Sequence, residues 1–433
     1  MNVHDSEVLA GMLEKEGYTP AASVEAADLI LLNTCCVREN AENRIFGHIG
    51  NLKALKEEKP ELIIGVCGCM AQEPGEVEKI KTKFPWVDLI FGTHNLHQLP
   101  ELLRQATGTH SRVIEVWDHD GAIVEGLPVK RSGRFRAWVT IMYGCNNFCA
   151  YCIVPHVRGR ERSRRPEAIL EEIRELVRDG VQEVTLLGQN VNSYGLDLAD
   201  AGGPEGIRNF AGLLRAIARG TGIRRIRFQT SHPKDLSEEL IAVMAEEPNI
   251  CRHLHLPVQA GSSRVLQLMN RRYTKERYLE LVARLKMRIP DISLTTDIIV
   301  GFPGEREEDF RETLDLVNQV RYDGAFTFIY SRRVGTPAAG FGDPVPEAEK
   351  KQWLMELINL QNRISLEKNR DWVGRITKLL VDGPSERNQR VWSGRNSQNK
   401  LVHFAPSAGV KEGDFINVRI TKAQTFTLEG EIV

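Results

Sequence analysis

The chain has 433 residues, 42% of them apolar, and this size suits roughly two to four globular domains. With 57 Lys and Arg against 58 Asp and Glu the formal charge is -1, so any basic surface for nucleic acid must be local. Collagen-like, low-complexity and wholly disordered chains are excluded. The sequence shows no signal-peptide pattern and no run of about 18 apolar residues, so we expect a cytoplasmic protein with reduced cysteines.

Helix and strand patterns alternate in the first part of the chain. Helical patterns cover Asp5–Glu16, Asn40–Glu58, Glu73–Phe84 and Leu96–Ala106, and strand-like runs cover Ala27–Leu32, Leu62–Val66 and Val87–Phe91. This alternation predicts a parallel αβ domain over residues 1–116, followed by a linker with Gly and Pro over residues 117–134. The first helix has no strand before it, so one βα unit lacks its strand.

A second alternating region covers residues 135–370. Strand-like runs lie at Trp138–Met142, Gln182–Leu187, Ile223–Phe228, His253–Val258, Ile292–Val300 and Gly324–Tyr330. Six strands alternating with helices indicate a partial βα barrel or an open parallel sheet. A long helix is expected over about Glu347–Asn369, and five short strands over residues 371–433 predict a small β-barrel. The fold class is therefore α/β with a small all-β module at its end.

Three cysteines lie close together in the segment Cys145-Asn-Asn-Phe-Cys149-Ala-Tyr-Cys152, directly after the first strand of the second region. The carboxyl ends of parallel strands are where αβ folds build their sites. Three thiolates from one loop can hold three irons of a [4Fe-4S] cluster and leave the fourth iron open. The spacing favours iron and leaves open a structural zinc site with His156 as the fourth ligand.

This loop resembles that of radical S-adenosylmethionine enzymes, and the chain as a whole resembles their methylthiotransferase family. The segments that carry the resemblance are Ile141–Cys145, Arg158–Arg164, Asn33–Glu39, Gly68–Gln72, Phe91–Asn95, Leu186–Asn192, His255–Gln259 and Asp297–Glu305. Within the family, the similarity is greatest to the branch that acts on N6-dimethylallyladenosine in tRNA. The C-terminal β module resembles the TRAM domain, a small RNA-binding barrel.

The resemblance implies a radical enzyme that uses S-adenosylmethionine. Cys145, Cys149 and Cys152 would hold a [4Fe-4S] cluster that cleaves S-adenosylmethionine reductively to a 5′-deoxyadenosyl radical. An unactivated aromatic C–H has no acid–base route at neutral pH, so the cofactor must supply the chemistry. Five residues that follow predicted strands would bind S-adenosylmethionine: Gly188, Gln189, Asn190, Gly301 and Gly304. Taken without the resemblance, the glycine turns that contain them would be ordinary loops.

The resemblance also implies a second, auxiliary [4Fe-4S] cluster that supplies the sulfur, with Cys35 and Cys69 as ligands. Both cysteines follow predicted strands, so their thiols should share one edge of the sheet. The other cysteines fit other places better: Cys36 should point away from Cys35, Cys67 should end a buried strand, and Cys251 should lie in the core.

The sequence departs from the family at its beginning. The family has a third N-terminal cysteine in a Gly-Cys-Gln-Met-Asn motif, and this sequence begins with Met1-Asn2, the end of that motif. We therefore expect a start further upstream that adds the missing strand and the third thiolate. As given, the auxiliary cluster lacks one ligand, and we expect about four bound irons rather than about eight.

Between residues 130 and 165 there are nine Lys and Arg and one acid, Glu161, so this segment carries +8. A charge of this kind beside the cysteine loop suits a polyanion such as tRNA, although a solvated loop is the alternative. The expected RNA contacts are Arg158, Arg160, Arg162, Arg164 and Arg165. The C-terminal module is only +2, so its RNA role depends on resemblance. For His232, His253 and His255, a structural role fits at least as well as a catalytic one.

We therefore expect a methylthiotransferase that modifies C2 of N6-dimethylallyladenosine, 3′ to the tRNA anticodon. Its partners would be that tRNA and an electron donor such as flavodoxin or ferredoxin, without a membrane. One alternative is a sister methylthiotransferase acting on threonylcarbamoyl-adenosine tRNA or on a ribosomal-protein aspartate. The segments Gly188–Asn192 and Phe91–Asn95 favour the dimethylallyl branch over it. Another is a zinc-stabilised RNA-binding protein, which would contain no iron.

Overall fold

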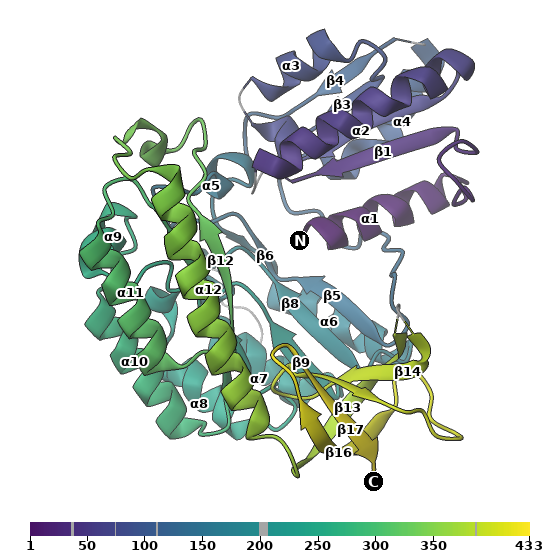
Figure 1. The fold of residues 1–433 in the computed structure, drawn as a ribbon. Helices are drawn as coiled ribbons and strands as arrows, with labels where there is room; N and C mark the ends of the chain where they lie inside the picture. The colour runs from purple at the N-terminus through teal and green to yellow at the C-terminus, as the bar shows by residue number, and fades with distance from the viewer. Residues whose placement is uncertain (36–38, 74, 110, 199–206, 386–387) are drawn as a thin grey trace. The chain divides into compact units, whose positions relative to one another are not determined.

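The structure is a computed structural model that describes residues 1–35, 39–73, 75–109, 111–198, 207–385 and 388–433 (Figure 1). The chain forms two compact units, each built from separate stretches. The first contains Met1–Ser132, Met142–Arg164 and Ser331–Ala339, and the second contains Gly133–Ile141, Arg165–Tyr330 and Gly340–Val433. The predicted domain bounds of 1–116, 135–370 and 371–433 follow the secondary-structure pattern instead, and they stay a prediction.

The first unit contains a parallel sheet with strand order β1-β2-β3-β4. Its strands are β1 (Leu29–Thr34), β2 (Ile63–Gly68), β3 (Leu89–Phe91) and β4 (Val113–Glu115). Its helices are α1 (Asn2–Lys15), α2 (Glu39–Glu58), α3 (Glu76–Lys83) and α4 (Leu99–Thr109), with short 3-10 turns η1 (Met70–Gln72) and η2 (Leu96–Gln98). The sequence pattern missed β4, because a three-residue edge strand is too short to show a period.

Two apolar layers cover the faces of this sheet. On one face, Ile49 and Leu52 of α2 and Ile80 of α3 pack with Ile64 and Val66 of β2. On the other face, buried side chains from α1, α4 and the sheet pack together: Val8, Leu9, Met12, Cys67, Leu89, Phe91, Leu99, Leu102 and Leu103. The β2 strand is buried on both faces, as expected for the inside of a parallel sheet.

The segment over residues 117–132 is packed as part of the first unit rather than as a loose linker. The Ser132 backbone N–H donates to Glu7 Oε1 at 3.0 Å, and the Lys130 N–H donates to the Glu7 carbonyl oxygen at 2.9 Å. Gly11 of α1 lies so close to the Pro128 backbone that a Cβ at this position would overlap it. The last part of the expected connector, from Pro128 to Ser132, is therefore packed and bonded against α1.

The second unit contains the six expected parallel strands. They form two three-stranded sheets: β5 (Arg136–Thr140), β8 (Glu183–Leu187) and β9 (Arg225–Phe228), and then β10 (His253–His255), β11 (Ser293–Val300) and β12 (Gly324–Ile329). A parallel bridge between Ile226 and Ile250 leads from the first sheet toward the second. The predicted partial barrel of six βα units is confirmed.

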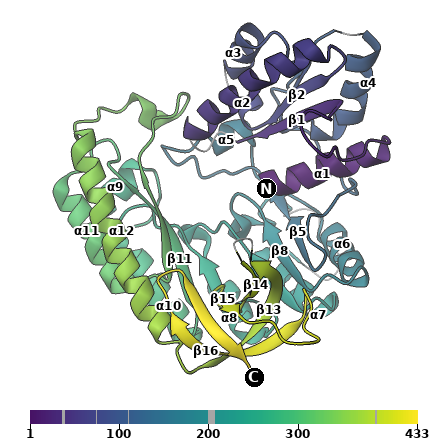
Figure 2. The ribbon, with the colours of Figure 1, turned by 45° about the vertical axis from the view of Figure 1, so that its right-hand side comes forward.

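Helices cover the outer faces of these strands, and α10, α11 and α12 run together along one side (Figure 2). The helices are α6 (Pro166–Arg178), α7 (Phe210–Gly220), α8 (Glu238–Glu246), α9 (Ser263–Leu268), α10 (Lys275–Arg288), α11 (Glu307–Val320) and α12 (Glu347–Arg370). The 3-10 turns are η3 (Val191–Ser193), η5 (Pro233–Asp235) and η6 (Pro337–Gly340). Side-chain caps begin several helices; for example, Asn209 accepts from the Gly212 N–H and Ser237 from the Leu240 N–H.

The C-terminal module is a closed barrel with strand order β13-β14-β15-β17-β16. Its strands are β13 (Ile376–Ser385), β14 (Asn388–Arg395), β15 (Leu401–Phe404), β16 (Phe415–Ala423) and β17 (Thr427–Ile432). It is docked on the amino ends of the barrel strands, where Arg225 donates to the Arg395 carbonyl at 2.8 Å and Arg227 to the Asn396 carbonyl at 2.7 Å. Glu183 accepts from Arg227 at 2.9 Å, so the buried charges are paired.

Candidate active site

The loop with Cys145, Cys149 and Cys152 is closed at its base by a small antiparallel ladder. The strands β6 (Met142–Tyr143) and β7 (Arg162–Ser163) pair across it, and the Cys145 N–H donates to the Gly159 carbonyl at 3.1 Å. Gly144 has a φ of 74° and lies against the backbone of Gly159 and Arg160, where a Cβ would overlap the Arg160 carbonyl. This position therefore requires glycine, both for its backbone angle and for the close approach.

The loop places its three thiols in partly or fully buried positions. Cys149 is buried, whereas Cys145 and Cys152 are half-buried, and the Cys152 N–H donates to the Cys149 carbonyl at 2.9 Å. Burial raises the pKa of the Cys145 thiol to about 11, while hydrogen bonds from Asn147 oppose this rise. Among the described side chains, no three of His, Cys, Asp or Glu converge as they would around a single ion. In ligand type and order, the three thiols fit an iron-sulfur cluster.

Cys35 and Cys69 follow neighbouring strands at the same edge of the first sheet. The last register pair of β1 and β2 is Thr34 with Gly68, so each cysteine comes directly after that pair. The Cys69 N–H donates to the Thr34 carbonyl at 3.1 Å, and the Thr34 hydroxyl donates to the Cys67 carbonyl at 2.6 Å. The expectation from the sequence that both residues lie at one edge agrees with this geometry. Their role as ligands stays a prediction.

The remaining cysteines lie in other environments. Cys67 is fully buried among apolar side chains of α1 and α4, where desolvation raises its thiol pKa. Cys251 is also buried, and desolvation raises its pKa too. Both places agree with core roles. Cys36 lies outside the described residues.

Arg158 lies beside Cys69 and was not expected there. Its Nε donates to Cys69 Sγ at 3.1 Å, and its Nη2 donates to Asp5 Oδ2 at 2.7 Å. Burial disfavours the charge of Arg158, but Asp5 and Cys69 outweigh this cost and hold its pKa above the ordinary value. The sequence contained no local signal for this contact, because Arg158 and Cys69 are 89 residues apart.

The five arginines expected to contact RNA fall into two groups. Arg158 and Arg164 are buried, and Arg164 pairs with Glu125 through its Nε at 2.8 Å. Arg162 is half-buried and donates to the Gly121 carbonyl. Only Arg160 and Arg165 of the five are exposed. The guanidinium groups of Arg158 and Arg164 are buried and pair with Asp5 and Glu125 rather than facing solvent, and the assignment of the five arginines to RNA stays a prediction.

In the second unit, the ends of β8 and β9 are joined by Asn190. Its Nδ2 donates to Asp235 Oδ2 at 2.7 Å, and its Oδ1 accepts from the His232 N–H at 3.1 Å. Several buried polar atoms near these strand ends find no hydrogen-bond partner within the part of the chain that the structure describes: Gln189 Oε1, Asn192 Nδ2 and Oδ1, Ser231 Oγ and His232 Nε2. Unsatisfied buried polar groups are costly, so this edge suits a polar ligand.

A second loop, after β11, carries the predicted Gly301 and Gly304. Their φ angles are 67° and 83°, in the region that favours glycine, and a Cβ on Gly301 would lie 2.6 Å from Lys350 Cδ. The same loop buries Glu305, which accepts from the Phe302 N–H at 3.0 Å. Desolvation raises the pKa of Glu305 to about 7. Glu305 ends the family-like segment Asp297–Glu305, and no role for it follows from the sequence alone.

The three histidines have structural partners. His232 Nδ1 accepts from the Lys234 N–H at 3.2 Å, and burial lowers the pKa of this imidazole to about 2. His253 and His255 each lie 3.0 Å from the Thr295 hydroxyl, and burial lowers the pKa of His253 to about 3. Burial thus favours the neutral imidazole at His232 and His253, and a structural role for the three histidines stays a prediction.

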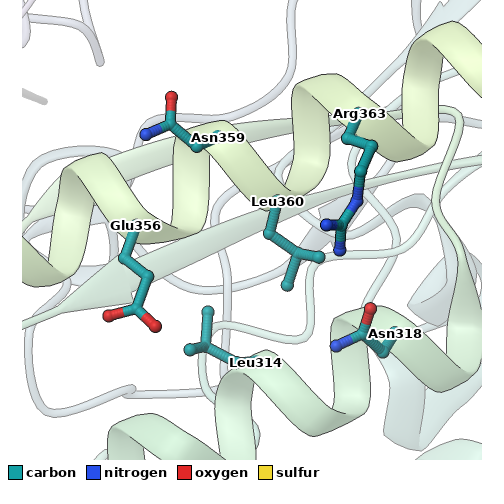
Figure 3. Close-up of a pocket in the computed structure, with 6 residues that line it drawn as sticks. All are labelled: Leu314, Asn318, Glu356, Asn359, Leu360 and Arg363. Carbon is teal, nitrogen blue, oxygen red and sulfur yellow. The ribbon is translucent and has the colours of Figure 1, made fainter.

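A groove lies between α11 and α12 (Figure 3). It is lined by Leu314, Asn318, Glu356, Asn359, Leu360 and Arg363. Leu314 and Leu360 point toward each other across it, and Arg311 pairs with Glu356 at 2.5 Å. These features are those of helix packing, and the groove contains none of the predicted site residues.

Three family models match the chain in order. Residues 1–92 match the uncharacterized protein family UPF0004, residues 139–317 match the Radical SAM superfamily, and residues 370–433 match the TRAM domain. The class that the fold and the cysteine loop define is therefore a radical SAM enzyme with a C-terminal TRAM domain. The expected enzyme class is confirmed.

Curated relatives give the particular family. The chain is 55% identical, over its whole length, to tRNA-2-methylthio-N(6)-dimethylallyladenosine synthase from Acetivibrio thermocellus and covers 89% of it. It is also 55% identical to the synthase of the same name from Carboxydothermus hydrogenoformans and covers 97% of that protein. The chain belongs to the tRNA-2-methylthio-N(6)-dimethylallyladenosine synthase family. The family expected from the sequence is confirmed.

Solved structures agree at the level of the fold. The radical S-adenosylmethionine methyltransferase TsrM from Kitasatospora setae matches with a TM-score of 0.55 at 16% identity, over 78% of this chain and 72% of that chain. The cobalamin-dependent radical enzyme OxsB matches with a TM-score of 0.52 at 15% identity, over 84% of this chain and 53% of that chain. Within the described residues, no helix has the length and apolar character needed to cross a membrane.

Proposed function

We propose that this protein adds a methylthio group at C2 of N6-dimethylallyladenosine, 3′ to the anticodon of tRNA. The observation that carries the proposal is the 55% identity, across the whole chain, to synthases named for this product. The closed cysteine loop over Met142–Ser163 supports it, because it supplies three thiols in the order that a radical cluster needs.

The residues of the chain would hold the cofactors as follows. Cys145, Cys149 and Cys152 would bind a [4Fe-4S] cluster, which, when bound, supplies the electron for reductive cleavage of S-adenosylmethionine. The unsatisfied atoms of Gln189 and Asn192 would bind polar groups of S-adenosylmethionine. Five backbone and side-chain positions would complete that site as predicted: Gly188, Gln189, Asn190, Gly301 and Gly304.

The first unit would hold the auxiliary cluster. Cys35 and Cys69 would be its ligands in this chain, because the β1–β2 register places them together at one edge. The buried Thr34 hydroxyl would orient this edge, since it accepts from the Met70 N–H at 3.2 Å while donating to the Cys67 carbonyl.

The substrate would reach the site as single-stranded RNA. Bases of an anticodon loop can be splayed into a pocket, unlike bases inside a duplex. The exposed Arg160 and Arg165 would neutralise phosphates, and the TRAM barrel would add a second RNA contact. The electron would come from flavodoxin or ferredoxin, and the protein would work in the cytoplasm, where tRNA is modified.

Mass spectrometry of tRNA nucleosides tests the substrate. Deletion of the gene should remove 2-methylthio-N6-dimethylallyladenosine and leave N6-dimethylallyladenosine in its place. Methylthiolated threonylcarbamoyl-adenosine in the same digest should be unchanged. Loss of that second nucleoside instead would assign the chain to the sister activity.

A further inference from the structure

Arg158 is a buried cation with two directed hydrogen bonds. It is 5% exposed, as is its partner Asp5, so the ion pair between them is screened from water. Within the described part of the chain, Arg158 forms its ion pair with Asp5, and Nη2 makes that bond at 2.7 Å. The Nε–H is directed elsewhere, to Cys69 Sγ at 3.1 Å. This second bond is what a thiolate, or a sulfur bound to metal, would accept.

The backbone around Arg158 is held independently of its side chain. Arg158 ends the short helix α5 (Val154–Val157), where its N–H donates to the Val154 carbonyl at 2.8 Å. Ile153 and Val157 pack directly on Cys69, and the Thr93 hydroxyl donates to the Val157 carbonyl at 2.6 Å. The approach of the guanidinium to Cys69 is therefore built into the packing of the segment that follows Cys152.

We propose that Arg158 is a positioning residue for the auxiliary cluster, holding the Cys69 sulfur in its ligand orientation and setting the reduction potential there. The inference rests on the proposed role of Cys69 as a ligand. Hydrogen bonds to cluster sulfurs and nearby positive charge favour the more negative, reduced cluster. Asp5 acts in the opposite direction, because its carboxylate partly cancels the guanidinium charge within a buried, weakly screened site.

The pair therefore predicts shifts of opposite sign. Arg158→Gln removes the cation and the N–H···S bond, so the potential should fall. Asp5→Asn leaves the cation in place without its carboxylate, so the potential should rise. A side chain that only supports the fold has no reason to produce two opposite shifts.

The experiment isolates the auxiliary site by using the Cys145→Ala/Cys149→Ala/Cys152→Ala protein as the parent. Parent and variants are loaded anaerobically with ferrous iron and sulfide, with excess dithiothreitol as an exchangeable further thiol ligand. The potential is read by electron paramagnetic resonance during a dye-mediated redox titration. Arg112→Gln is the matched control, because Arg112 bonds the Val87, Lys81 and Phe84 carbonyls within the same unit.

The outcomes separate this inference from the proposed function. A cluster that depends on Cys69, with the potential lowered by Arg158→Gln, raised by Asp5→Asn and unmoved by Arg112→Gln, supports it. The same cluster with a potential that neither change moves overturns the inference alone. No cluster on the parent, or one that survives Cys69→Ala, overturns the proposed auxiliary site as well.

Either single variant leaves a buried charge without its partner, which lowers the stability of the folded state. The Asp5→Asn/Arg158→Gln protein removes both charges together and keeps side chains of similar size. Its potential should lie below that of Asp5→Asn alone, because the N–H···S bond is lost. An equal potential in these two proteins would also overturn the inference.

Discussion

The two cysteine sites of the first unit are built in different ways. Cys145, Cys149 and Cys152 lie within eight consecutive positions, on a loop closed by its own β6–β7 ladder. Cys35 and Cys69 come together only through the register of β1 with β2, and the Cys69 sulfur also meets Arg158 from a third segment. A local loop can keep its geometry when distant parts change, whereas the sheet edge depends on the whole unit.

The largest expected effect is the loss of S-adenosylmethionine cleavage when the cysteine loop loses one thiol. Cys149→Ala should reduce release of 5′-deoxyadenosine to background, a loss of at least about 100-fold, because a cluster without this thiolate loses an iron or its geometry. Cys67→Ala is the control, since Cys67 is also buried but lies in the apolar layer under α1 and α4. Unchanged release from Cys149→Ala would contradict the radical assignment.

Removal of the Cys69 thiol at the sheet edge should leave S-adenosylmethionine cleavage in place. Cys69→Ala, loaded in the presence of dithiothreitol, should lower the iron bound per chain while 5′-deoxyadenosine release stays within about twofold of the wild-type protein. Iron analysis and product chromatography on the same sample make the comparison. If release fell together with iron, the two sites would be one cooperative structure rather than separable ones.

One glycine-to-alanine change tests the backbone of each cysteine site, at Gly144 in the loop and at Gly68 at the sheet edge. Gly144→Ala should cost more than the ~1–2 kcal/mol of a left-handed backbone, because the new Cβ meets the Arg160 carbonyl. Gly126→Ala is matched in φ, at 70° against 74°, but meets nothing within 4 Å. At the sheet edge, Gly68→Ala should act similarly, since its Cβ would lie 2.5 Å from the Thr34 carbonyl.

Thermal unfolding and cluster absorption read both changes. Gly144→Ala should lose the absorption that depends on Cys149, and Gly68→Ala the iron that depends on Cys69. Equal losses from Gly144→Ala and Gly126→Ala would show that only backbone angle matters at these positions.

The smallest effect concerns two neighbouring arginines. The Arg160 guanidinium is exposed and lies 4.5 Å from the centroid of the Phe148 ring, whereas Arg164 is buried and pairs with Glu125. Arg160→Ala should weaken tRNA binding and reduce its log–log salt slope by about one unit. Arg164→Ala should leave the slope unchanged and lower the thermal midpoint. A slope change in Arg164→Ala would return that side chain to the RNA surface.

Much of this arrangement follows from local patterns. The six barrel strands, the five strands of the C-terminal barrel and the cysteine loop were all predicted, because period, turn residues and spacing are short-range signals. The shared edge of Cys35 and Cys69 was also predicted, since parallel strands end together.

What the sequence left out depends on contacts between distant residues. A run of alternating arginines looks uniformly basic, yet two of them, Arg158 and Arg164, are buried and pair with Asp5 and Glu125. Neither partner is near its arginine in sequence, so composition alone assigned all five to the surface. The unsatisfied atoms of Gln189 and Asn192 are likewise visible only when every neighbour is placed.

The bonding of residues 117–132 has a consequence for dissecting the protein. Glu7 accepts from Ser132, Asp120 accepts from the Arg160 N–H at 3.1 Å, and Glu125 pairs with Arg164. A protease cut or a gene truncation before Trp117 would separate Glu7 from Ser132 and Cys69 from Arg158, whereas Asp120 and Glu125 would stay with the arginines that they bind. An isolated fragment ending there would leave Glu7 without Ser132 and free the start of α1. Fragments that keep residues 1–164 together retain all three of these bonds.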